Sequence, residues 1–340
     1  ATWNEDLGLW MTSKGATGVK DEYDDGYVAG EQTPAQYYFS IDSLTNEISI
    51  EYGDAGITTL EVPSTIDDKN VVSLTGMGSA ALTSITFAPN SHVRSVGGLG
   101  GSSIKEIALP DSVEELKSYA FYKSKTLQTV TWPNNAAFTT IPEQAFKECE
   151  QLDDKVVATL PPSVKTIDYL AFAYCGVPQF YVSDTTVLTF TQINVPGTVE
   201  RIERNAFDGC SHVSSVTIGD GVKYIGAHAF ASLDPAIAGK EIVLPKSVEM
   251  IEWGSFENTR YGNETNHNAV ALRVMNPDLQ FGEAGYPGDY NERVTIDGVT
   301  YAIPFSEGQT IYAYATDSAG NPSMVKKLAD AVADRKDSVD

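Results

Sequence analysis

The sequence has few of the residues that usually carry chemistry. Its 340 residues include only three cysteines and four histidines. No Cys-x-x-Cys pair occurs and no histidine falls at a ligand spacing, so the signature of a zinc site is missing. The motifs Gly-x-Ser-x-Gly, His-Glu-x-x-His and Gly-Lys-Ser/Thr are missing as well. We therefore expect a protein that is not an enzyme, with no catalytic residue, no cofactor and no metal.

Long apolar runs and positive charge are also scarce. No stretch reaches the roughly 18 apolar residues that a membrane span needs. The chain begins at Ala1 without a basic segment followed by an apolar one, so we expect any export signal to lie outside this sequence. Lysine and arginine number 23 against 46 aspartates and glutamates, which gives a net charge of −23. Such a surface repels phosphate backbones, and nucleic acid is excluded as an expected partner.

What the sequence does contain is an internal repeat. An apolar residue is followed by Ile or Leu three positions later, and by Phe five positions beyond that. The residue before Phe is Ala in five copies and Ser in the sixth. Six copies with one internal spacing predict a stack of similar coils. The copies are Val113/Leu116/Phe121, Phe138/Ile141/Phe146, Val164/Ile167/Phe172, Val199/Ile202/Phe207, Val222/Ile225/Phe230 and Val248/Ile251/Phe256.

A second pattern, apolar-x-x-apolar-x-apolar and often closed by proline, lies upstream of the copies. Its alternating end predicts a strand, which proline stops because it cannot donate to the ladder. The Val-x-x-Ile pair is predicted as a second extended piece, and Ala-Phe as a short helical or 3₁₀ turn. Stacking is expected to turn each position into a continuous column, including a strand ladder. Examples are Ile104/Ile107/Leu109, Leu127/Val130/Trp132, Phe190/Ile193/Val195 and Val213/Val216/Ile218.

These repeats resemble the BspA-like leucine-rich repeats of bacterial surface proteins. The resemblance lies in I-K-E-I-A-L-P-D-S-V-E-E-L-K-S-Y-A-F at residues 104–121, and in F-T-Q-I-N-V-P-G-T-V-E-R-I-E-R-N-A-F-D-G-C at residues 190–210. It covers about residues 37–330. It implies a leucine-rich-repeat solenoid, a right-handed β/α repeat made mostly of strands and short turns, with a cap at each end.

The chain is expected to divide into three parts. Residues 1–36 form an N-terminal leader or cap, residues 37–257 the repeat array, and residues 258–340 a degenerate last repeat, a loop insertion and a capping helix. The helix is placed at residues 321–336, where apolar residues recur at helical spacing. The glycine-rich residues 97–101 are interpreted as a shortened coil rather than a dinucleotide-binding loop.

The three cysteines, Cys149, Cys175 and Cys210, are expected to share one column, because each follows a repeat Phe by three residues. A thiol ladder that binds metal or undergoes redox chemistry is one interpretation. Packing is the favoured one, since free cysteine behaves as a small buried apolar residue. One disulfide between neighbouring coils stays open.

The resemblance implies a secreted or surface-anchored protein that recognises or adheres to an extracellular protein or glycan. The favoured binding surface is the strand ladder, because residues between the strand anchors point outward and repeat proteins bind along such faces. The same polar strip is equally compatible with a plain solvated sheet face without a defined site. The Tyr-rich residues 258–303 are a second candidate surface. The residues singled out on the strands are Gln128, Thr129, Thr131, Gln192, Asn194, Ser215 and Thr217.

An alternative function stays open: an accessory protein or enzyme of polysaccharide or peptide processing, with its site in the non-repeat residues 258–309. Such a site needs convergent carboxylates, or a nucleophile with its base. The candidates there, which qualify only by being acidic, are Asp278, Glu283, Asp289 and Glu292.

Overall fold

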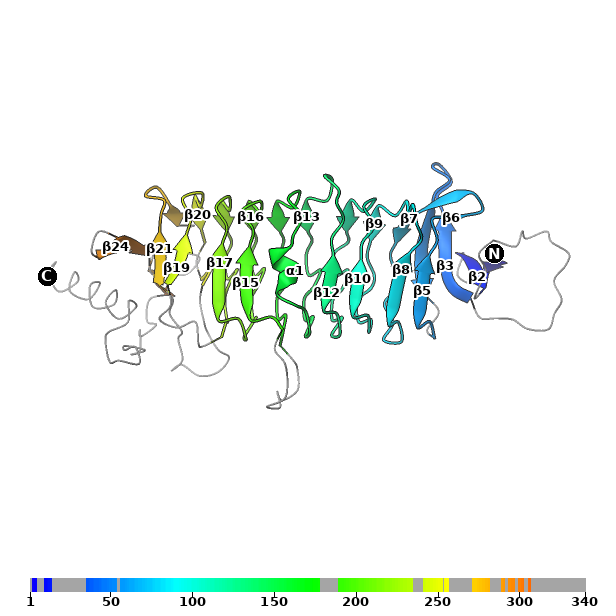
Figure 1. The fold of residues 1–340 in the computed structure, drawn as a ribbon, viewed down its shortest axis with the longest axis horizontal. Coiled ribbons are helices and arrows are strands. Elements are labelled where there is room, and N and C mark those ends of the chain that lie inside the picture. Colours follow the sequence, from blue (N-terminus) through cyan, green and yellow to red (C-terminus); the bar gives the residue numbers. More distant parts are fainter. Residues whose placement is uncertain are drawn as a thin grey trace.

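The structure, a computed structural model of the chain, is an elongated stack of coils that lie side by side (Figure 1). No helix in the part of the chain that it describes is long and apolar enough to cross a membrane. The described residues are 2–4, 9–13, 35–53, 56–177, 189–234, 241–252, 254–256 and 271–281, together with 289–290, 293–296, 299–302 and 305–306.

One side of the stack carries the longer strands, and we call it the long-strand face. Its strands pair in parallel in separate groups rather than in one ladder. In each strand the anchor side chains are buried and most of the residues between them are exposed, as the alternation predicts. The pairs are β5 (Thr59–Val62) with β8 (Ser84–Phe87), β10 (Glu106–Ala108) with β12 (Thr129–Thr131), β15 (Gln192–Val195) with β17 (Ser215–Ile218), and β19 (Glu241–Leu244) with β21 (Ala271–Val274).

The other side is formed by the Val-x-x-Ile pairs, and we call it the short-strand face. Six two-residue strands pair in parallel there, and the register joins Ile141 to Ile167, Ile202, Ile225 and Ile251 in turn. This confirms the stacking register predicted from the repeat. The strands are β13 (Thr140–Ile141), β14 (Thr166–Ile167), β16 (Arg201–Ile202), β18 (Tyr224–Ile225), β20 (Met250–Ile251) and β22 (Gln280–Phe281).

Another sheet precedes this ladder in the chain, and further strands extend both ends of the stack. This earlier sheet begins with antiparallel strands and continues in parallel through the early coils. It contains β1 (Thr2–Asn4), β2 (Leu9–Ser13), β3 (Ala35–Ile41), β4 (Ile48–Gly53), β7 (Lys69–Leu74), β9 (Ser95–Val96) and β11 (Glu115–Leu116), with β6 (Thr65–Ile66) against β7. At the far end, β25 (Val299–Ala302) and β24 (Arg293–Ile296) extend β21, and β23 (Asp289–Tyr290) pairs with β26 (Phe305–Ser306).

The repeat phenylalanines form one column through the centre of the stack. Rings of successive coils lie parallel, with centroids 5.1–5.4 Å apart and interplanar angles of 4–13°. The backbone N–H of each Phe from Phe121 to Phe230 donates to the carbonyl of the residue before the next Phe. That residue is fully buried in every coil, because the neighbouring coil lies directly against it. A small side chain is therefore required, which explains the Ala or Ser before each Phe.

The Ala-Phe segments are successive tight turns rather than the predicted helical or 3₁₀ turns. The reason is a left-handed residue two positions before each Phe, with φ between 52° and 62°. A single left-handed residue breaks a right-handed helix, because the two conformations cannot share one hydrogen-bond ladder. A second left-handed residue follows most of the phenylalanines by two positions. The residues in the first column are Tyr119, Gln144, Leu170, Asn205, His228 and Gly254.

The prediction of a continuous strand ladder is wrong in the coil that contains Phe172. Helix α1 (Lys155–Ala158) occupies the place of a long strand between β12 and β15. Val156 and Val157 are both buried, and two adjacent inward side chains cannot occur on a regular strand. The indole of Trp132 donates a hydrogen bond of 3.1 Å to the carbonyl of Val156, which ties α1 to the preceding coil.

The glycine-rich residues 97–101 form the predicted shortened coil. Leu99 is fully buried in the place of a repeat Phe, and its N–H donates to the carbonyl of Ala120, 2.8 Å away. Gly98 has φ 61°, and a Cβ there would lie 1.6 Å from the carbonyl oxygen of Thr75. No other residue fits, because the coils approach each other through their backbones at this point.

Two predictions fall largely outside the described residues. The capping helix placed at residues 321–336 lies wholly outside them, as does much of the segment 258–309. The proposed division at residues 36 and 257 likewise stays a prediction.

Candidate functional site

The residues singled out on the long strands lie at the surface, but they form two patches rather than one strip. Thr129 and Thr131 are exposed on β12, while Ser215 and Thr217 are exposed on β17. Helix α1 separates the two pairs of strands. The remaining members are Gln128, which donates to Gln151 across 3.2 Å, and, on β15, the exposed Gln192 and the half-buried Asn194.

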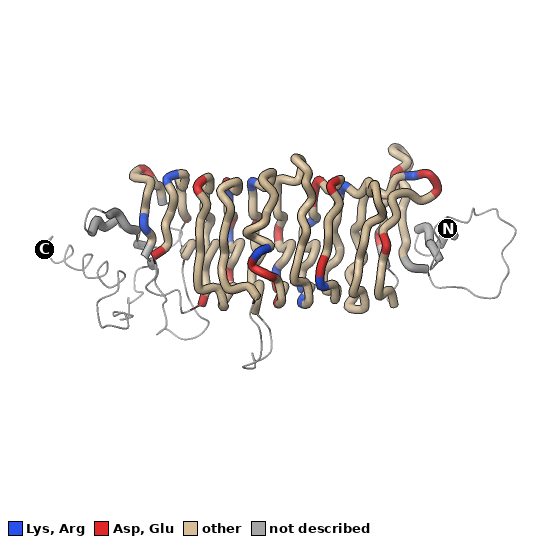
Figure 2. The backbone as a smooth tube through the Cα atoms, viewed as in Figure 1, with Lys and Arg blue, Asp and Glu red and all other residues tan. Residues whose placement is uncertain are grey.

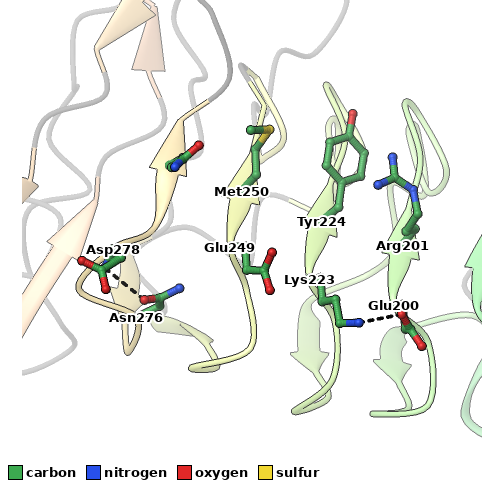
Figure 3. Close-up of a pocket in the computed structure, with 9 residues that line it drawn as sticks. Glu200, Arg201, Lys223, Tyr224, Glu249, Met250, Asn276 and Asp278 are labelled. Atoms are coloured by element: carbon green, nitrogen blue, oxygen red, sulfur yellow. Dashed lines mark hydrogen bonds and ion pairs between the residues drawn. The ribbon is translucent and has the colours of Figure 1, made fainter.

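An open groove of about 640 Å³ lies on the short-strand face, and of the residues singled out in the sequence only Asp278 lines it. Its side chains come from β16, β18, β20 and β22, from the residue before each of the first three strands, and from the turn before β22 (Figure 3). Most occupy the two variable positions inside Val-x-x-Ile, which the parallel register brings side by side. The sequence does contain a signal for this groove. The two variable positions are Glu-Arg, Lys-Tyr and Glu-Met in three successive coils, so charged, aromatic and apolar side chains become neighbours.

Opposite charges alternate along the first of these variable positions. Lys165, Glu200, Lys223 and Glu249 follow one another in successive coils. The ammonium of Lys223 donates to Glu200 across 2.8 Å, and this bond lowers the pKa of the Glu200 carboxyl. Charged residues of both signs are distributed along the whole described stack (Figure 2). Exposed pairs of this kind contribute little stability, but they favour the correct coil-to-coil register.

At the second variable position, the cation of one coil packs on the aromatic ring of the next. The guanidinium of Arg201 lies 4.1 Å from the ring centroid of Tyr224 and donates to Glu203 through Nε across 2.7 Å. The hydroxyl of Tyr224 donates to Glu252 across 2.6 Å, and partial burial together with that carboxylate raises the pKa of Tyr224. Both contacts fix the ring upright between Arg201 and Met250 (Figure 3).

The three cysteines lie buried in one column, as their spacing predicts, and all three are free thiols. The thiols of Cys149, Cys175 and Cys210 each donate to a Phe carbonyl of the preceding coil, at 3.1–3.2 Å. Ser124 makes the same bond to the carbonyl of Leu99 at 3.0 Å. Burial raises the pKa of each thiol, so the reactive thiolate is disfavoured. The column serves packing, and the disulfide that the sequence left open does not form.

The other chemically interesting residues are scattered. His92 is exposed, and the half-buried His212 and His228 lie in different turns. Within the described ranges, no three His, Cys, Asp or Glu side chains gather as a metal site would require. Of the four acidic candidates for an enzymatic site, Asp278 is exposed and lines the groove. The side chains of Glu283, Asp289 and Glu292, and those of the tyrosines at 258–303, lie outside the described residues.

These features define the class of the protein as a bacterial-type leucine-rich-repeat solenoid, built from short strands and turns around a Phe column. Six copies of the BspA type leucine-rich repeat region match residues 77–189 and 185–268, more than half of the chain. The chain belongs to that family.

Solved structures with similar coils come from several bacteria. A leucine-rich repeat protein of Bacteroides ovatus is 20% identical over 64% of this chain and 48% of its own, with a TM-score of 0.40. The pneumococcal vaccine antigen PcpA is 22% identical over 64% and 56%, with a TM-score of 0.38. The T. pallidum leucine-rich repeat protein is 21% identical over 65% and 87%, with a TM-score of 0.40. The chain thus spans about half the length of the first two. No curated protein matches.

Proposed function

We propose that this chain is a non-catalytic recognition module that acts outside the cell, secreted or attached to the cell surface. In this proposal it binds an extracellular protein or glycan through the surface of the repeat stack. The observation that carries the proposal is the parallel register, which presents variable side chains of successive coils in fixed rows on a rigid core. The family membership supports the bacterial repeat-scaffold part of it.

Rigidity supports a binding role because an ordered surface loses little conformational entropy on association. The stacked rings and the ladder of turn hydrogen bonds hold each coil against the next. The exposed hydroxyls and amides of the long-strand face suit hydrogen bonds to a glycan or to a polar protein surface. We place the principal contacts on its two patches, at Gln128, Thr129 and Thr131, and at Gln192, Asn194, Ser215 and Thr217.

The test uses the full chain, labelled with biotin, on an array of glycans and purified extracellular-matrix proteins. Two double variants place acidic groups on the patches: Thr129→Glu with Thr131→Glu, and Ser215→Glu with Thr217→Glu. The matched control is Thr139→Glu with Thr140→Glu, which makes the same change on the short-strand face. We expect at least one ligand to be retained by the control and lost by one patch variant. Binding to no ligand would contradict the recognition function, and equal loss in all three variants would contradict the assignment of the face.

A further inference from the structure

We propose that the groove on the short-strand face binds an arginine or lysine side chain presented by a polypeptide partner. The proposal rests on the recognition function above and gives one of its surfaces a specific chemistry. It is argued from the arrangement of Tyr224, Met250, Glu249 and Asp278, all of which line the groove.

The aromatic ring in the groove already binds one cation from the chain itself. Arg201 occupies one side of Tyr224 at 4.1 Å from the ring centroid, and its guanidinium is neutralised by Glu203. On the other side the neighbouring coil presents Met250, a flexible apolar side chain, instead of a second cation (Figure 3). A cation over the face of a tyrosine is attracted by the ring quadrupole, and the aliphatic stem of Arg or Lys packs against thioether and methylene groups.

The two cations that line the groove donate their hydrogen bonds to carboxylates other than Glu249 and Asp278, so a cation from a partner can bind there. Lys223 gives its hydrogen bond to Glu200, and Arg201 gives one to Glu203. The carboxylates of Glu249 and Asp278 are exposed in the adjoining coils. Lys223 lies near Glu249 as well, and Glu200 and Glu249 together raise its pKa, but its hydrogen bond goes to Glu200. The amide of Gln280 lies in the same groove. Met250 lies between Tyr224 and the coil that carries Asp278. A partner side chain would pack its aliphatic stem on Met250, and its charged head would reach the acceptor oxygens of Glu249 and Asp278.

The charge of the whole chain favours the same partner. A net charge of −23 attracts basic segments over a distance of about a Debye length and repels anionic glycans and phosphates. Long-range attraction alone makes any acidic protein bind polycations weakly, so the proposal has to be tested for location as well as for charge.

The experiment measures fluorescence polarisation of a labelled peptide, Gly-Ser-Arg-Leu-Arg-Ser-Gly, at physiological ionic strength. A peptide with glutamine in place of both arginines is the ligand control. The groove variant is Glu249→Gln with Asp278→Asn. The matched protein control, Glu61→Gln with Glu106→Gln, loses the same two charges from exposed positions on β5 and β10 of the long-strand face. A third variant, Met250→Arg, supplies a cation to the groove from the chain itself.

We expect the arginine peptide to bind the unmodified chain at least tenfold more tightly than the glutamine peptide. The groove variant should weaken that binding at least fivefold, Met250→Arg should abolish it, and the charge-matched control should change it less than twofold. The proposal is overturned if the arginine peptide fails to bind at millimolar concentration, if both peptides bind alike, or if the two double variants lose affinity equally. If the peptide test fails and the array is positive, the recognition function stands and the groove is not its cation site. If the array fails and the peptide binds as expected, the groove binds cations, but the proposed contacts with glycans and matrix proteins are wrong.

Discussion

The two faces of the stack come from the same coils, yet the short strands form long parallel runs, one ending at β11 and one of six strands from β13 to β22, whereas the long strands are divided into pairs. The short strands precede each Phe by a fixed number of residues, so the Phe column sets their register. The long strands follow loops of variable length, and in one coil α1 takes their place. The difference teaches that the buried Phe turn sets the pairing register in this fold. Strands at a fixed distance from that turn along the chain keep the register, whereas strands beyond a variable loop do not.

The strongest test of this idea removes one ring from the Phe column. Phe207→Ala should lower the free energy of unfolding by about 3–5 kcal/mol, because the fully buried ring stacks on Phe172 and Phe230 and the cavity cannot collapse between two fixed coils. Thr217→Ala on the long-strand face, the control, should change it by less than about 0.5 kcal/mol. Denaturant titration followed by circular dichroism measures both. Similar values for the two variants would refute the central role of the column.

The next test concerns the left-handed residue that joins the short strand to the Phe turn. Gln144 has φ 52°, a conformation that β-branched side chains strongly disfavour. Gln144→Val should therefore destabilise the protein by about 1–2 kcal/mol, whereas Gln144→Asn should be nearly neutral, since Asn tolerates this region. Thermal unfolding of the two variants distinguishes them. Equal melting temperatures would show that the turn can change its conformation.

A smaller effect is expected in the Cys column. Cys175→Ala removes a buried sulfur and its hydrogen bond of 3.1 Å to the carbonyl of Phe146, which should cost about 1 kcal/mol. Cys175→Ser should cost less, because Ser124 already makes the equivalent bond earlier in the column. Chemical denaturation compares the two. A larger loss for serine than for alanine would mean that the column selects for apolar volume rather than for a donor.

The smallest effect concerns Asp208, beside the Phe turn between the faces. Burial raises the pKa of this carboxyl, although the hydrogen bond that Asn205 donates to it across 3.0 Å acts in the opposite direction. A raised folded-state pKa means that the folded protein holds the proton more tightly, so the stabilising contribution is present at low pH and lost as pH rises through that pKa.

Asp208→Asn should therefore melt slightly above the unmodified protein at pH 7, and the difference should shrink as the pH falls toward 4. Melting temperatures measured across that range test the sign. A variant that is less stable at pH 7 and more nearly equal at pH 4 would indicate that the carboxylate stabilises the fold when ionised.

The sequence predicted the coil register and the buried columns because those positions obey fixed spacings and a strict requirement for apolar or small side chains. It did not reveal α1, since the buried Leu152 and Leu160 on either side of it are apolar like strand anchors, and the hydrogen bond from the indole of Trp132 to the carbonyl of Val156 joins two coils. It also did not find the groove. The repeat spacing aligns the variable positions that line it, but their residue types form no known motif of a binding site.

The sequence by itself thus determined the class of fold, the stacking order and the family, because each depends on a local pattern repeated along one axis. Tertiary structure alone decided which contacts the aligned variable side chains make. Tyr224 meets Arg201 on one side and faces Met250 on the other because parallel pairing superimposes residues of different coils. The repeat spacing aligns these three residues, but it does not contain the side-chain conformations that place a guanidinium over one face of the ring.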